Sequence, residues 1–256
     1  MMTINSAAAE RGAAWLTEGF GYFTRGAGAW LVMTVIFIIF MALASALPMA
    51  NLLFIFLSPL LIGGMLLACH EQDNGAAATV GHLFAGFSRN TGQLVLLGLF
   101  HFIGLLLITA VTVVATLLSV GMAAIHNLFS QLTNVMHTGD IYASVDAAQA
   151  LLLPLLLLLL YFAFFYVPLI MALWFSPALV MLKHQNAVDA MVNSFKGCAA
   201  NIVPFLVYGV VGLVLSIIAS IPMMLGWLIL FPVIVASVYL GYKDIFSEEV
   251  EPAADA

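Results

Sequence analysis

Few residues in this chain could do chemistry, and His101 stands out because it interrupts a long apolar stretch. Burying an imidazole, even uncharged, requires a hydrogen-bond partner, so an ionisable residue inside a membrane span is a candidate for a proton or ligand role. The alternative is a neutral histidine whose hydrogen bonds another helix satisfies. Asn201 and Tyr208 lie near the start of a later apolar stretch, and together with His101 they form a candidate intramembrane polar site. Interhelical hydrogen bonds would also explain Asn201 and Tyr208.

A second group of potential ligands lies in one polar segment. Its members are of types that bind metal ions, and they are Cys69, His70, Glu71, Asp73 and His82. Their spacing matches none of the usual zinc motifs, so we expect no metal and no cofactor. The apolar stretches contain no Asp or Glu, and the sequence has neither a phosphate-binding glycine loop nor a nucleophile elbow. We therefore predict no catalytic residues and a protein that is not an enzyme.

The elements that must position these residues are membrane helices. Of the 256 residues, 64% are hydrophobic and 7% are charged, whereas soluble domains contain about 25% charged residues. Several apolar stretches reach the roughly 20 residues that a membrane helix needs. We predict six spans, at about residues 30–47, 51–69, 93–124, 150–175, 201–221 and 224–242. The expected fold class is an all-α, polytopic membrane helical bundle, with residues 1–246 as a single transmembrane domain and 247–256 as a disordered acidic tail.

Short amphipathic helices are predicted before spans one, three and five. Residues 13–23, 80–87 and 187–195 each place apolar side chains on one helical stripe. The third begins with Asn186, and Asp189 follows at the spacing of a helix N-cap with an acidic third position. These helices are too short and too polar to cross a bilayer, so we expect them to lie along its surface.

Each amphipathic segment ends in the same local pattern. An aromatic residue comes just before Arg25, Arg89 or Lys196, and small and polar residues then lead into a span. The pattern predicts an internal repeat of three units with two spans each. We expect Arg25, Arg89 and Lys196 to reach lipid phosphates from the helix ends, either as simple anchors or as a dedicated head-group site.

The basic residues also predict the orientation. All six Lys and Arg residues flank the same ends of the predicted spans, while the loop at 125–149 contains Asp140 and Asp146 and no basic residue. Since Lys and Arg favour the cytoplasmic side, both termini should be cytoplasmic. The short turns expected at Pro48 and Pro222 then lie on the opposite side. With a net charge of −6 and six Lys and Arg residues, the sequence lacks the basic patch that nucleic-acid binding needs, so we expect no nucleic-acid partner.

Three stretches of the sequence resemble one protein family. FSPALV, beginning at Phe175, is followed by AMVNSFKGCAANIVPF, and both WLTEGFGYFTRGAGAWL and VGHLFAGFSRNTGQLVLLG look like the same family. The chain resembles a family of uncharacterised proteobacterial six-span inner-membrane proteins, and is more distantly similar to the YciC-like proteins and to the membrane domain attached to some glycerophosphodiester phosphodiesterases. The resemblance implies an all-helical bacterial inner-membrane protein, and it brings no activity and no site residues with it.

Two functions remain open from the sequence. The first is a non-catalytic integral inner-membrane protein that organises membrane lipids or partner proteins, for which the surface helices and the nearly uncharged spans argue. The second is a small channel or transporter for ions or for apolar, lipid-like solutes, for which His101 and the mid-span prolines Pro59 and Pro232 argue. Assembly of a homo-oligomer around a central pore also stays open.

Overall fold

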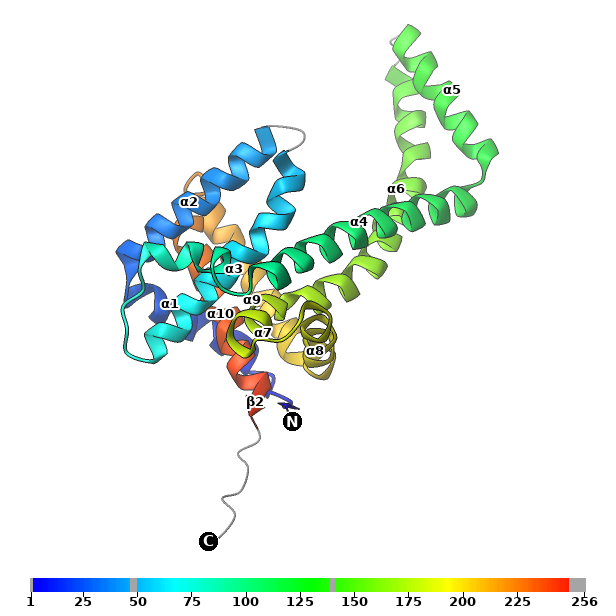
Figure 1. Cartoon of the computed structure of the whole chain (residues 1–256). Helices are drawn as coiled ribbons and strands as arrows, with labels where there is room; N and C mark the ends of the chain where they lie inside the picture. The colour runs from blue at the N-terminus through cyan, green and yellow to red at the C-terminus, as the bar shows by residue number, and fades with distance from the viewer. Residues whose placement is uncertain (1, 47–49, 139–140, 249–256) are drawn as a thin grey trace. The chain divides into compact units, whose positions relative to one another are not determined.

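The computed structural model of the chain describes residues 2–46, 50–138 and 141–248. Within these ranges the protein is almost entirely helical (Figure 1). The elements, in chain order, are β1 (Met2–Ile4), α1 (Arg11–Thr24), α2 (Ala27–Ala46), α3 (Ala50–Asp73), the 3₁₀ helix η1 (Val80–Phe87), α4 (Thr91–Val120), α5 (Met122–Thr138), α6 (Ile141–Trp174), α7 (Ser176–Lys183), α8 (Ala187–Ala200), α9 (Ile202–Ser220), α10 (Trp227–Ile245) and β2 (Phe246–Glu248).

Six helical segments in the described ranges are long and apolar enough to cross a membrane. They are α2, α3, α4, the segment Ala148–Lys183 formed by α6 and α7, α9 and α10. This confirms the predicted all-α polytopic helical bundle with six transmembrane helices. The polar segments before spans one, three and five also form short helices, namely α1, η1 and α8.

Several span boundaries differ from the sequence prediction, the largest difference being the fourth span, which continues through α7 to Lys183. Two further differences have a clear structural cause. The third span ends at Val120, before the expected residue 124, because Gly121 has a φ of 82° that breaks the helix. A separate helix, α5, follows. At the C-terminus, Ser247 and Glu248 belong to β2, which pairs antiparallel with β1, so regular structure continues two residues past the expected boundary. The rest of the acidic tail, the turn at Pro48 and Asp140 lie outside the described residues.

The chain divides into two compact units. One unit contains Met1–His101 and Met171–Ala256, and the other is Phe102–Ile170. In the second unit, the packing of α4 on α6 is close, since a Cβ added at Gly104 would lie 2.8 Å from a methyl group of Leu169. A hydrogen bond of 2.8 Å also joins the hydroxyls of Ser119 and Tyr161. The single transmembrane domain expected from the sequence stays a prediction.

The core of the first unit lies where α1, α3, α7 and α10 meet. Trp15, Trp30, Phe175 and Tyr239 are among its largest fully buried side chains. Within this unit α1 packs on α9 and α10, while η1 and α7 pack on α3, and α8 packs on α7. The pairing of β1 with β2 places Met2–Ile4 beside Phe246–Glu248, at the foot of this unit in the view of Figure 1.

Glycines allow the closest of these contacts. A Cβ at Gly86 of η1 would lie 2.3 Å from the carbonyl oxygen of Leu60, and one at Gly64 of α3 would lie 2.2 Å from that of His82. Both distances are well inside van der Waals contact, so η1 and α3 approach backbone to backbone. The segment 80–87, predicted as an amphipathic helix, is a 3₁₀ helix. These glycine contacts show that it packs directly on α3.

Candidate functional site

The helix α8 has three faces of different chemistry. Its buried face carries small residues, which are Ala187, Ala190, Ser194, Gly197 and Cys198. Large apolar side chains point outward on the second face, with Val188 55%, Val192 46% and Phe195 40% exposed. The third face carries Asp189, Asn193 and Lys196. The large apolar residues that a soluble helix would bury are the ones that α8 leaves uncovered, as expected for a helix at a membrane surface.

The buried face of α8 supplies hydrogen bonds to backbone groups at a break in the fourth span. Phe175 follows Met171 by four residues, so in an unbroken helix its N–H would donate to the Met171 carbonyl. The helix breaks between α6 and α7, and the Ser194 hydroxyl lies between the two groups: it accepts from the Phe175 N–H at 2.9 Å and donates to the Met171 carbonyl at 2.7 Å. Ser194 thus gives the buried Phe175 N–H its partner, and it shares the Met171 carbonyl with the Cys198 thiol, which donates to that carbonyl at 3.5 Å.

The start of α8 is held by two further contacts. The side chain of Asn186 accepts from the Asp189 N–H at 2.9 Å, which is the N-cap expected from the sequence. The Ala187 N–H donates to the Gln93 side chain of α4 at 2.8 Å. The helix is therefore fixed at its N-terminus and through its buried face.

Next to α8 lies an open apolar groove of about 520 Å³. Its lining comes from α4, α6 and α8, and consists of Phe100, Ala172, Val188, Met191, Val192, Phe195 and Lys196. Lys196 is the only charged residue of this lining and is exposed. Its ammonium group makes no hydrogen bond or ion pair with another described residue.

The 3₁₀ helix η1 resembles α8 on its outer side. Phe84 and Phe87 are exposed large apolar residues, and Arg89, also exposed, lies two residues after Phe87. Within the described part of the chain the Arg89 guanidinium has no hydrogen-bond or ion-pair partner. The aromatic and the basic residue are thus both available at a surface, as the sequence pattern predicts for lipid head-group contacts.

The helix α1 differs, although its sequence ends in the same pattern. Phe23 is only 8% exposed, and its neighbour Arg25 is engaged by the protein. The Arg25 guanidinium lies 4.0 Å from the Asp73 carboxylate and 4.2 Å above the centre of the Tyr22 ring. Of the three predicted head-group contacts, Arg25 therefore lies in a protein network, whereas the charged groups of Arg89 and Lys196 lie free at the surface.

Asp73 is the centre of that network. Its carboxylate accepts hydrogen bonds from the hydroxyls of Tyr22 at 2.6 Å and Tyr239 at 3.1 Å, and from the Lys243 ammonium at 2.5 Å. Burial, and then the hydrogen bond to Asp73, raise the pKa of Tyr22 above its usual value. The network ties α1 to the ends of α3 and α10.

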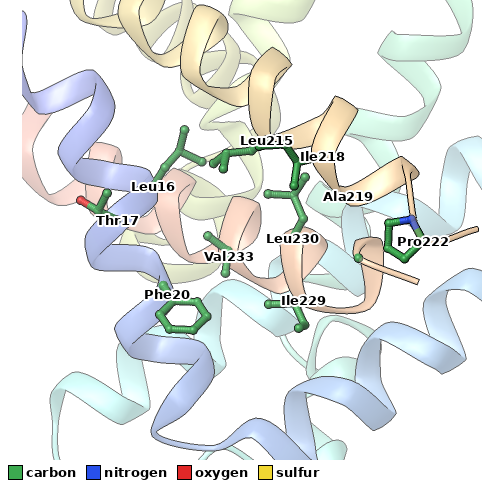
Figure 2. A pocket seen from close by; sticks show the side chains of 11 residues that line it. Leu16, Thr17, Phe20, Leu215, Ile218, Ala219, Pro222, Ile229, Leu230 and Val233 are labelled. Atoms are coloured by element: carbon green, nitrogen blue, oxygen red, sulfur yellow. The ribbon is translucent and has the colours of Figure 1, made fainter. Parts of the chain in front are cut away.

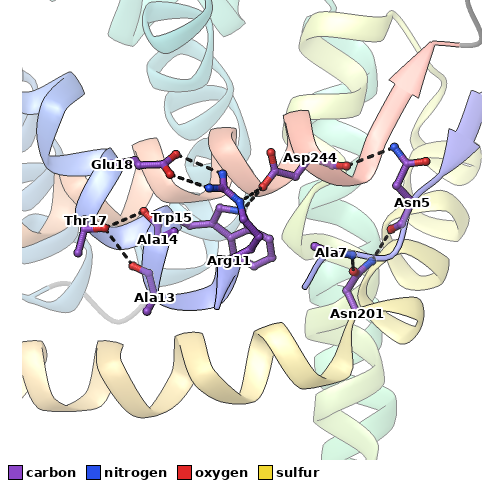
Figure 3. A network of polar contacts seen from close by, with 10 residues as sticks. All are labelled: Asn5, Ala7, Arg11, Ala13, Ala14, Trp15, Thr17, Glu18, Asn201 and Asp244. Atoms are coloured by element: carbon purple, nitrogen blue, oxygen red, sulfur yellow. Dashed lines mark hydrogen bonds and ion pairs between the residues drawn. The ribbon is translucent and has the colours of Figure 1, made fainter. Parts of the chain in front are cut away.

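A second polar network holds the N-terminal segment (Figure 3). Arg11 donates to Glu18 at 2.6 Å and to Asp244 at 2.7 Å, and the indole N–H of Trp15 donates to the same Asp244 oxygen at 2.7 Å. The hydrogen bonds to Glu18 and Asp244 raise the pKa of Arg11, so it stays charged at any physiological pH. In the same view, the Asn201 side chain accepts from the Ala7 N–H at 2.7 Å.

A second groove, of about 530 Å³, lies between α1, α9 and α10 (Figure 2). Side chains such as Leu16, Phe20, Leu215 and Val233 converge on it, and its lining contains no charged residue. Thr17 is the one polar side chain of this lining, and the groove differs from the one beside Lys196 in having no basic residue in its lining.

The three residues of the predicted intramembrane site do not join one another. Asn201 is buried and bonds to backbone groups, and Tyr208 shares a hydrogen bond of 2.9 Å with the Ser237 hydroxyl of α10. His101 is half-buried in α4, and its imidazole makes no hydrogen bond to another described residue. Tyr208 thus links α9 to α10, and Asn201 links the start of α9 to the N-terminal segment.

The potential metal ligands have separate roles. Cys69 is fully buried, Asp73 belongs to the network above, and His82 accepts the Thr79 N–H at 3.0 Å to cap η1. Across residues 2–46, 50–138 and 141–248 no three His, Cys, Asp or Glu side chains gather as a metal site.

Comparison of the chain with protein-family models, with curated proteins and with solved structures finds no match. The resemblance noted from the sequence therefore stays a prediction.

Sequence reasoning missed three features of the structure around α1, α8 and their neighbours. It did not find the role of Ser194, the network around Asp73 or the groove beside Lys196. Each depends on contacts between residues far apart in the chain. The one local signal was the small-residue spacing of Ala190, Ser194 and Gly197 in α8, which is typical of close helix packing.

Proposed function

We propose that this protein is a non-catalytic integral membrane protein that organises lipids at the surface formed by η1 and α8. The observation that carries the proposal is the outward apolar face of α8, with Lys196 beside it. A helix of this kind inserts its apolar face at the boundary between head groups and acyl chains, while adjacent cations favour phosphate groups. Arg89 after the exposed phenylalanines of η1 would add a second contact of the same type.

The sequence supports placing this surface on the cytoplasmic side of a bacterial inner membrane. All six basic residues belong to the ends at which α1, η1 and α8 lie, and this bias favours the cytoplasm. The resemblance to proteobacterial inner-membrane proteins is in line with this location. On this proposal both termini are cytoplasmic, and membrane lipids are the principal partners.

The test is the amount of lipid that the protein immobilises in a bilayer. We would reconstitute the protein in phosphatidylethanolamine and phosphatidylglycerol vesicles and measure the immobilised fraction of spin-labelled lipid per protein. Replacing Val188→Ser and Val192→Ser together should lower this fraction, because the outer face of α8 would lose its apolar contact. The control is Ala199→Ser with Ala200→Ser, which adds the same hydroxyls at exposed positions without removing large apolar groups. Equal immobilised fractions in all three proteins would contradict the proposal.

Transport is our second candidate, and His101 is the observation that favours it. Its imidazole lies in a membrane span, half-buried and without a hydrogen bond to another described residue. The same vesicles, with a pH gradient imposed, would reveal proton-coupled flux of ions or small solutes. Flux that His101→Ala abolishes would favour transport, and flux that this change leaves intact would remove His101 from the pathway.

A further inference from the structure

The groove between α4, α6 and α8 places a basic residue beside an apolar hollow. Its walls are apolar, with the methylene chain of the exposed Lys196 among them, and the ammonium group at the end of that chain lies outside the lining. The groove of Figure 2 has nearly the same volume but no charged lining residue. The two grooves therefore have similar sizes and mainly apolar walls, and only the first has a lysine in its lining.

In the orientation proposed above, the groove would reach from the membrane surface into the bilayer. Lys196 lies six residues before α9 begins, and so at the level where a span enters the membrane. Phe100 lies nine residues after Thr91, the first residue of α4, or about 14 Å along the helix axis at 1.5 Å per residue. A ligand that fits both ends must carry a negative charge at the surface and an apolar chain below it.

Resting on the proposed function, we propose that this groove is a binding site for one anionic diacyl phospholipid. Its phosphate lies against the Lys196 ammonium, and one acyl chain lies along Val192, Met191 and Ala172 toward Phe100. The charge complementarity selects an anionic lipid over a zwitterionic one, since a zwitterionic head group brings its own cation next to Lys196. The apolar walls supply affinity that does not depend on the head group.

The experiment measures which lipids stay bound. The protein, in bilayer nanodiscs with equal amounts of phosphatidylglycerol and phosphatidylcholine, is released into mild detergent, and the retained lipids are counted by native mass spectrometry. One lysine at a membrane surface is worth about 1 kcal/mol of attraction to anionic lipid, so we expect about fivefold enrichment of phosphatidylglycerol. Lys196→Gln should abolish the enrichment, and Lys196→Arg should keep it.

Two further variants separate the groove from general electrostatics. Ala172→Leu fills the groove and leaves Lys196 in place, so it should lower the retention of both lipids. Lys183→Gln removes the same charge from α7, outside the groove lining, and should leave the enrichment unchanged. Enrichment that survives Lys196→Gln, or that falls equally in Lys183→Gln, would overturn the proposal. So would an Ala172→Leu protein that changes its oligomeric state but not its bound lipid, because a second copy of the chain would then occupy the groove.

Failure of this inference can be distinguished from failure of the proposed function. If the immobilised lipid fraction depends on Val188 and Val192 but the retained lipid shows no head-group preference, the surface organises lipids without a selective site. If neither measurement responds to changes in α8, both proposals are wrong.

Discussion

The helices α1 and α8 have similar sequences and opposite surroundings. Both precede a span, both contain an aromatic residue followed closely by a basic one, and both carry an apolar stripe. The stripe of α1 is buried in the protein, with Trp15, Leu16 and Phe23 in the core. The stripe of α8 points outward, and small residues make its protein contacts. An amphipathic pattern thus predicts that a face will be covered, but not whether protein or lipid covers it.

The largest expected difference between the two helices concerns their aromatic residues. Trp15→Ala removes a fully buried side chain and its hydrogen bond to Asp244, so we expect a loss of about 3–5 kcal/mol in the free energy of unfolding. Phe195→Ala changes an exposed residue of α8 and should cost about 0.5 kcal/mol or less in detergent. Denaturant titration in micelles measures both values. Similar losses for the two variants would mean that α8 is as deeply packed as α1.

The close approach of α1 to α9 gives the next prediction. A Cβ at Gly12 would lie 2.0 Å from the Pro204 carbonyl oxygen, so Gly12→Ala should cost about 1–3 kcal/mol through overpacking. A Cβ at Gly21, in the same helix, would meet nothing within 4 Å. Gly21→Ala should therefore be neutral or stabilise by up to about 1 kcal/mol, because alanine favours the helix. Equal effects at the two glycines would show that α1 does not dock on α9.

The docking of α8 can be tested through its small-residue face. Ser194→Ala leaves the Phe175 N–H and the Met171 carbonyl without the hydroxyl that joins them, which should cost about 1–3 kcal/mol. Thr24→Ala is the control, because its hydroxyl bonds to the Gly21 carbonyl at an exposed position of α1. A Ser194→Ala protein as stable as wild type would mean that the hydrogen bonds from α8 do not stabilise the break between α6 and α7.

A smaller, local effect is expected at Cys198. Burial raises the pKa of its thiol from 9.0 to about 12, so at pH 8–9 the folded protein should contain very little thiolate. In a Cys69→Ala background we expect slow maleimide labelling at Cys198 and fast labelling of an added Ala199→Cys. Above pH 9 the unfolded chain would lose its thiol proton first, so stability should fall as the pH rises toward 12. Labelling of Cys198 that rises sharply near pH 9 would indicate that α8 lifts off the protein.

Much of the fold could be predicted from the sequence because its signals are local. Long apolar stretches define the six spans, and the spacing of Asn186 and Asp189 predicted the N-cap that α8 uses. The break at Gly121 and the strand at Ser247 were missed, since the first depends on one backbone angle and the second on pairing with the other chain end.

The candidate site was predictable only in part. The exposed positions of Arg89 and Lys196 follow the aromatic and basic pattern, but the same pattern at Arg25 did not reveal its contact with Asp73. The three segments look alike in sequence because each combines an apolar stripe with a basic residue that closely follows an aromatic one. They differ in environment because Asp73, Tyr22 and Tyr239 come together only in the folded chain.

The central claim is that the outer face of α8 lies in lipid, and spin-label accessibility tests it most directly. A nitroxide would be placed by Val192→Cys, and for comparison by Asp189→Cys on the polar face, in a protein whose native cysteines are replaced by alanine. In phosphatidylethanolamine and phosphatidylglycerol bilayers, we predict that the label at position 192 collides with oxygen and is shielded from a water-soluble nickel chelate, with the reverse at position 189. Equal access of the nickel chelate to both labels would contradict the account.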